Sequence, residues 1–287
     1  MKNALHAFIA LAALGVLASG STASGQEDNG TEYRKLAPGV MTTIEAEPLA
    51  EETVSTHDIV EILALDPEFQ TAKNVSFRRD VWALEFSFKP VRMVWVDVPQ
   101  PGDKMRRQLV WYMIYKVTNT GAILHPVEKN ETPQKFDVER VSRPLRFIPQ
   151  FLLEDPESEK VYSDRLVPVA MQPIRRREDP NRRLLTTVEM SQQQIAPGES
   201  VWGVVTWLGV DPRIDRFSVY VIGLTNAYRW HDEPGAYKPG DPLGTGRQLR
   251  WKTLKLNFWR PGDEYYQHED EIRFGQPGGV DWEWVYR

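Results

Sequence analysis

From Val81 onward the sequence is built of short apolar runs, each ended by proline, glycine, asparagine or aspartate. Residues 91–98 alternate between apolar and other side chains, and Pro99-Gln-Pro-Gly102 follows them as a turn. Period-two alternation between turn residues is the pattern of β-strands. Residues 109–117 are mostly apolar on both sides, which is typical of a strand in the middle of a sheet. These patterns predict an all-β protein.

A short helix is predicted only near the start, where Ser55 or Thr56 caps it and Asp66-Pro67 ends it. Many short strands without long helices favour an antiparallel β-sandwich, with a barrel as the second choice. The other predicted strands are residues 84–88, 136–141, 147–154, 160–167, 184–190, 201–208, 217–224 and 249–259.

The predicted organisation has four parts. Residues 1–25 are a signal peptide, and residues 26–80 are a polar leader that includes the short helix. Residues 81–262 form the β-sandwich domain. Residues 263–287 form a C-terminal extension, either a docked tail or an added strand, because apolar and polar residues alternate again at its end.

The first 25 residues have the pattern of a cleavable secretory signal. Lys2 supplies the positive start, residues 7–18 are an apolar run, and small residues precede Gln26. The apolar run is shorter than the roughly 20 residues that span a bilayer. An uncleaved anchor is the alternative. We therefore expect an exported protein, periplasmic or extracellular, with no transmembrane segment in its mature part.

Composition excludes several classes of protein. The 287 residues include no cysteine, which rules out a disulfide framework, a thiolate nucleophile and a cysteine-bound metal. An apolar fraction of 41% is enough for a packed core. The formal net charge of −5 gives no general attraction to nucleic acid, so nucleic acid is not an expected partner.

Several motifs resemble known exported bacterial proteins. Val117-Thr-Asn-Thr-Gly121, then Phe151-Leu-Leu-Glu-Asp155, then Ile195-Ala-Pro-Gly-Glu-Ser200 resemble, in that order, the immunoglobulin-like sandwich modules of such proteins. Trp82-Ala-Leu-Glu-Phe-Ser-Phe-Lys-Pro90 and Gly223-Leu-Thr-Asn226 are similar to a set of uncharacterised exported bacterial proteins. The resemblance covers residues 81–225. It implies a fold and a location, and it carries over no activity and no site residue.

Motifs for catalysis or cofactor binding are largely missing. The sequence has no Gly-x-Ser-x-Gly, no His-Glu-x-x-His and no phosphate-binding loop, so we expect no cofactor. His57, His125, His231 and His268 lack metal-ligand spacing and are interpreted as surface or turn residues. The acid-rich residues 263–271 are the best candidate for a cation, but a solvated loop is favoured and no metal site is predicted.

Five arginines lie within residues 175–183 and form a candidate anion-binding site. The planar guanidinium group suits carboxylate and phosphate, so a sugar acid or an acidic protein face would fit it. The alternative, which we favour, is a solvated loop that joins two strands. The arginines are Arg175, Arg176, Arg177, Arg182 and Arg183.

Five of the ten tryptophans fall into two expected groups. Trp111 and Trp207 lie inside apolar strands and are predicted to be core. Trp251 and Trp259 alternate with Leu254, Leu256 and Phe258, so we expect the two tryptophans to face outward. Trp230, beside His231 and Asp232, is expected in a loop. The candidate ligand-binding residues are Trp230, Trp251 and Trp259.

The sequence also contains a short repeat. Arg107-Gln-Leu-Val-Trp111 recurs as Arg247-Gln-Leu-Arg-Trp251 with one mismatch. Two strands that begin alike by chance are favoured over a duplication.

These observations predict a non-enzymatic binding or structural module of the cell envelope, whose partner is a glycan or another envelope protein. One alternative is a carbohydrate-binding protein that uses exposed tryptophans. Another is a hydrolase with an unrecognised carboxylate pair, because 40 acidic residues always leave some pair at a workable distance.

Overall fold

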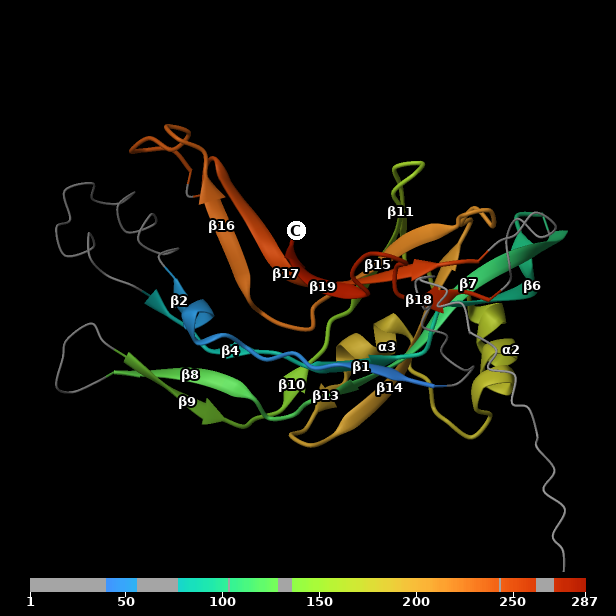
Figure 1. Ribbon diagram of the computed structural model, residues 1–287, viewed down its shortest axis with the longest axis horizontal. Helices are drawn as coiled ribbons and strands as arrows, with labels where there is room; N and C mark the ends of the chain where they lie inside the picture. Colours follow the sequence, from blue (N-terminus) through green and yellow to red (C-terminus); the bar gives the residue numbers. More distant parts are fainter. Residues whose placement is uncertain (1–39, 56–76, 103, 129–135, 243, 262–270) are drawn as a thin grey trace, which may run out of the picture. The chain divides into compact units, whose positions relative to one another are not determined.

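The structure is a computed structural model that describes residues 40–55, 77–102, 104–128, 136–242, 244–261 and 271–287 (Figure 1). The predicted signal peptide, most of the leader and almost all of the predicted N-terminal helix lie outside the described residues. So do His57, His268 and all of the acid-rich segment except Glu271.

The described chain is mostly antiparallel β-sheet, as expected, and two large sheets contain most of its strands. In the first sheet, β7 lies between β14 on one side and β5 and β6 on the other, and β1 pairs with β5. The strands of the first sheet are β1 (Thr42–Ile44), β5 (Glu85–Phe88), β6 (Arg92–Gln100), β7 (Lys104–Thr118) and β14 (Ser200–Leu208).

The second sheet is arranged around β17. β15 and β16 follow one another along one edge of β17, and β18 and β19 follow one another along the other edge. β11 pairs with β15, and β12 pairs with β11. The strands of the second sheet are β11 (Gln150–Asp155), β12 (Lys160–Ser163), β15 (Arg216–Ile222), β16 (Tyr228–Asp232), β17 (Arg247–Trp259), β18 (Arg273–Phe274) and β19 (Trp282–Tyr286).

Shorter elements complete the described structure. They are the 3-10 helix η1 (Ala50–Thr53), the helices α2 (Pro168–Glu178) and α3 (Thr187–Gln192), and three small sheets. The small sheets pair β2 (Val54–Ser55) with β3 (Phe77–Arg78), β10 (Leu145–Arg146) with β13 (Gln194–Ile195), and β8 (Ile123–Glu128) with both β4 (Val81–Trp82) and β9 (Phe136–Val141).

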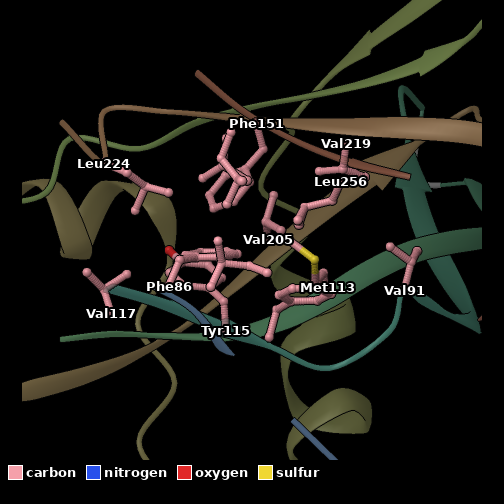
Figure 2. Packing of buried hydrophobic residues seen from close by; sticks show 14 of the residues in the cluster. Phe86, Val91, Met113, Tyr115, Val117, Phe151, Val205, Val219, Leu224 and Leu256 are labelled. Atoms are coloured by element: carbon pink, nitrogen blue, oxygen red, sulfur yellow. The ribbon is translucent and has the colours of Figure 1, made fainter. Parts of the chain in front are cut away.

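The main core lies where the two large sheets meet face to face. The Trp111 ring of β7 lies 5.4 Å from the Phe217 ring of β15, edge to face. Trp111 and Trp207 are fully buried, which confirms the prediction that they are core. Figure 2 shows Phe86, Met113 and Tyr115 of the first sheet against Phe151, Val219 and Leu256 of the second.

A glycine makes room for one of these aromatic rings. Gly203 of β14 lies directly opposite Tyr115 of β7. A Cβ at position 203 would overlap Cζ of the Tyr115 ring, which is completely buried. The tyrosine ring can therefore pack against β14 only because residue 203 has no side chain.

Most predicted strands are confirmed, and two segments differ. Residues 184–190 were expected to be a strand, but α3 begins at Thr187 instead. The Thr186 side chain accepts a hydrogen bond from the Glu189 backbone N–H, and the Glu189 carboxylate accepts one from the Thr186 backbone N–H. This capping box outweighs the strand preference of the apolar residues before it.

The second difference is α2, where a loop was favoured for the arginines. Pro168 occupies the first turn, where proline is well tolerated. Val167, Ala170 and Ile174 then pack against the outer face of the first sheet. The predicted strand 160–167 ends at Ser163 for the same reason, since the chain leaves the sheet to form this helix.

Two long strands extend beyond the rest of their sheets as hairpins (Figure 1). β7 pairs with β5 through residues 115–118 and with β6 through residues 104–112. β17 pairs with β15 through residues 254–259 and with β16 through residues 247–251. We name these extensions the β6–β7 hairpin and the β16–β17 hairpin.

Candidate functional site

One face of the β16–β17 hairpin gathers exposed aromatic and apolar side chains. Directly opposite residues of an antiparallel pair, and every second residue along a strand, point to the same face. The register places Tyr228 opposite Trp251, Trp230 opposite Leu249, and Asp232 opposite Arg247. We call the face formed by these six residues the aromatic face.

Trp251 and Leu249 are the exposed centre of the aromatic face. The Trp251 residue is 46% exposed and Leu249 is 45% exposed, which is unusual for side chains of this size. The Tyr228 ring lies 5.3 Å from the Trp251 ring at an interplanar angle of 59° and supports it from one side. The face thus offers an indole ring next to an aliphatic side chain.

Trp230 plays a different part on the same face. The Arg247 guanidinium lies 4.6 Å from the centre of the Trp230 ring, and so covers one side of the indole. Arg247 also donates to both carboxylate oxygens of Asp232, at 2.8 and 3.1 Å, and its side chain is only 5% exposed. Trp230 was expected in a loop, but it lies in strand β16, half-buried beneath this ion pair.

The opposite face of the same hairpin is basic. Arg229 and Arg250 lie directly opposite each other across the two strands, and both are exposed. Like charges in this position repel each other. His231 and Gln248 form the next pair on this face and are also exposed. The hairpin therefore combines an aromatic face with a positively charged one.

A buried ionic cluster holds the base of the hairpin. Lys252 of β17 donates to Glu52 of η1 at 2.8 Å, and the Tyr286 hydroxyl of β19 donates to the same carboxylate at 2.6 Å. Burial alone would raise the pKa of Glu52, but these two hydrogen bonds, one from the Leu49 N–H and the Lys252 charge lower it overall. Glu52 is therefore an ionised anchor at neutral pH.

Trp259 does not belong to the aromatic face. It lies eight residues from Trp251 along β17, which is roughly 26 Å in an extended strand. It pairs with Arg216 and Arg273, and the Arg273 guanidinium lies 5.3 Å from its ring. The prediction that Trp259 faces outward holds in part. Leu254, Leu256 and Phe258 on the other side of the strand are buried, as expected, but Trp259 itself is half-buried.

The predicted anion site is divided between α2 and the turn after it. Arg177 donates to the Met93 carbonyl at 2.8 Å, and Arg182 donates to Asp179 at 2.9 Å. The Arg182 guanidinium also lies 4.0 Å above the Trp202 ring. Both arginines thus have structural partners. Arg175, Arg176 and Arg183 are exposed.

Beside this arginine group lies a buried carboxylate, Glu178. Its side chain is 2% exposed, and it accepts hydrogen bonds from Lys89, Arg92 and Tyr112 at 2.7 to 2.8 Å. Burial would raise the pKa of Glu178, but the hydrogen bonds and the two positive charges outweigh it and lower the pKa. Hydrogen bonding to the ionised carboxylate makes this cluster a structural tie for α2.

The structure also exposes two large side chains that sequence reasoning did not select. Trp95 of β6 is 57% exposed and Met105 of β7 is 60% exposed, both on the β6–β7 hairpin. The alternation of residues 91–98 could have predicted that Trp95 is exposed. Val94, Val96 and Val98 occupy the side that α2 covers, which leaves Trp95 on the opposite side.

The described part of the chain holds no candidate metal centre and no candidate membrane-spanning helix. Within it, no group of three or more histidine, aspartate or glutamate side chains is placed to hold a metal ion. His125 pairs with Asp80 at 2.6 Å and is half-exposed. No helix among the described residues is long and apolar enough to cross a membrane.

No family model, no curated protein and no solved structure matches this chain. A functional proposal must therefore be argued from the residues described above.

Proposed function

We propose that the protein is an exported, non-enzymatic binding protein of the cell envelope, built on an immunoglobulin-like sandwich, and that it binds a glycan on the aromatic face. The observation that carries the proposal is the exposure of Trp251 and Leu249 side by side on a two-stranded extension. Contiguous exposed apolar surface on a soluble domain is a feature of binding sites.

The chemistry of the face fits a sugar ring. A pyranose has an apolar C–H face that packs on an indole and hydroxyl groups that need hydrogen-bond partners. Trp251 supplies the indole, and Tyr228 restricts its orientation. Asp232, whose side chain is 31% exposed, supplies hydrogen-bond acceptors at the edge of the face. A rigid aromatic ring beside a fixed polar group binds with little loss of side-chain freedom.

Retention on immobilised and soluble polysaccharides tests this proposal. We expect Trp251→Ala to weaken retention on the polysaccharide that the unaltered chain binds, because it removes the exposed indole ring of the aromatic face. Trp282→Ala is the matched control, because Trp282 is 40% exposed but lies on β19, outside the aromatic face. Equal losses in both variants would contradict the proposal, and so would binding of a protein but of no polysaccharide.

A further inference from the structure

The two hairpins carry the same residues in the same register. In the β6–β7 hairpin, Trp95 lies opposite Leu109 and Asp97 lies opposite Arg107. In the β16–β17 hairpin, Trp230 lies opposite Leu249 and Asp232 lies opposite Arg247. The short sequence repeat is therefore part of a longer similarity between the two hairpins. Both have Trp-x-Asp on the first strand and Arg-Gln-Leu-x-Trp on the second.

The match extends to a contact between side chains. The Arg107 guanidinium lies 5.6 Å from the centre of the Trp95 ring, and the Arg247 guanidinium lies 4.6 Å from the centre of the Trp230 ring. In both hairpins an arginine of the second strand thus covers the tryptophan of the first. The two hairpins belong to different sheets, yet they share this local arrangement of side chains.

The hairpins differ in whether the face that carries the matched residues becomes the core side of the sheet. In β7 the matched face runs into the core, so Trp111 is fully buried. In β17 the core side is the opposite one, which holds Leu254, and Trp251 of the matched face is exposed. The first hairpin consequently exposes residues nearer its tip, Trp95 and Met105.

Charge narrows the kind of ligand. Lys104, Arg106 and Arg107 are exposed on the second strand of the β6–β7 hairpin, and Asp97 is the one acid among the hairpin residues that the structure describes. On the β16–β17 hairpin, Arg229 and Arg250 are exposed on the face opposite the aromatic face, and the Arg229 guanidinium lies 4.1 Å from the centre of the Tyr286 ring. Each hairpin is a ribbon only two strands wide, so its basic side chains attract a negatively charged polymer that lies along either face, although the whole chain is acidic.

We propose that the Trp95 surface of the β6–β7 hairpin is a second binding site, and that both hairpins take an acidic polysaccharide. This inference rests on the proposed function, which it deepens by naming a second site and the class of glycan. A long polymer of this class engages both hairpins, so its affinity exceeds that for a short fragment of the same sugar.

The test uses polygalacturonate, its tetramer, and neutral dextran, with binding measured by calorimetry on the whole chain. We expect the Trp95→Ala, Met105→Ala double variant and the Trp251→Ala variant each to lower the affinity for the polymer roughly tenfold or more. Each should keep binding of the tetramer at the remaining hairpin. Rising salt should weaken polymer binding, and Arg107→Gln should reduce that salt dependence.

Trp282→Ala is again the matched control, and circular dichroism verifies that each variant is folded. Polymer binding that is unchanged in the Trp95 and Met105 variant but lost with Trp251→Ala would overturn the second site and leave the proposed function standing. Equal binding of dextran and polygalacturonate would overturn the acidic class. The absence of binding to any polysaccharide would overturn both proposals.

Discussion

The hydroxyl of Tyr112 donates a 2.8 Å hydrogen bond to the carboxylate of Glu178, and so ties the middle of β7 to the last residue of α2. Lys89 and Arg92 approach the same carboxylate from the segment that links β5 to β6 and from the start of β6. One carboxylate thus joins the helix, the β6–β7 hairpin and the first sheet.

Replacing this carboxylate should destabilise the fold. Glu178→Gln leaves two positive charges beside a neutral amide, and breaking a buried ion pair of this kind costs about 3 kcal/mol. Urea unfolding measures the loss. The control is Glu157→Gln, at an exposed turn position, which should change the unfolding free energy by less than about 0.5 kcal/mol. Similar values for both variants would contradict the structural role of Glu178.

The same carboxylate should make the unfolding free energy depend on pH in the acidic range. The pKa of Glu178 is lower in the folded chain than its usual value of 4.5, despite burial, because of its hydrogen bonds and the charges of Lys89 and Arg92. Its contribution is therefore complete above about pH 4.5 and is lost as the pH falls through the folded pKa. Unfolding measured from pH 6 down to about pH 3 should show a shallower loss in Glu178→Gln than in the unaltered chain. An equally steep loss in the two would argue against this coupling.

At the base of the β16–β17 hairpin, Tyr286 should make the unfolding free energy depend on pH in the alkaline range. Burial, together with its hydrogen bond to Glu52, raises the pKa of Tyr286 to about 12. The unfolded tyrosine ionises near pH 10, so the stabilisation is complete below about pH 10 and is lost as the pH rises toward 12. Tyr286→Phe should lower the unfolding free energy at pH 7 by about 1.5 kcal/mol. It should also flatten the alkaline decline, and an unchanged decline would contradict the assignment.

A methyl group at Gly203 should test the packing of the main core. Gly203→Ala would place a Cβ so close to Cζ of Tyr115 that the two atoms overlap, and overpacking of a core costs about 1–3 kcal/mol. Gly279→Ala is the control, because the atoms nearest to its added Cβ belong to the flexible Gln276 side chain, at 3.1 Å or more. A thermal melt in which both variants lose the same stability would count against close packing at Gly203.

Much of the β-structure was predictable from local patterns. The alternation in residues 249–259 places Leu254, Leu256 and Phe258 in the core because the strand has one side against the first sheet. The same rule places Trp259 on the other side of the strand, but it cannot show that Trp259 is half-buried, because Arg273 reaches its ring from β18.

The helices were missed for a physical reason. Residues 184–190 contain enough apolar residues for a strand, yet the capping pair Thr186 and Glu189 determines the outcome locally. For α2 the decisive partner is the outer face of the first sheet, which only the folded chain presents. The hairpin match likewise depends on which residues face each other, and only the register reveals it.

The most direct measurement is fluorine NMR of the chain with its ten tryptophans replaced by 5-fluorotryptophan, each resonance being assigned by substitution with phenylalanine. Titration with polygalacturonate should shift the resonances of Trp251, Trp230 and Trp95, and leave those of the buried Trp111 and Trp207 unchanged. Spectra in which none of the three hairpin tryptophans shifts, or in which only tryptophans outside the two hairpins respond, would contradict the assignment of the binding surface.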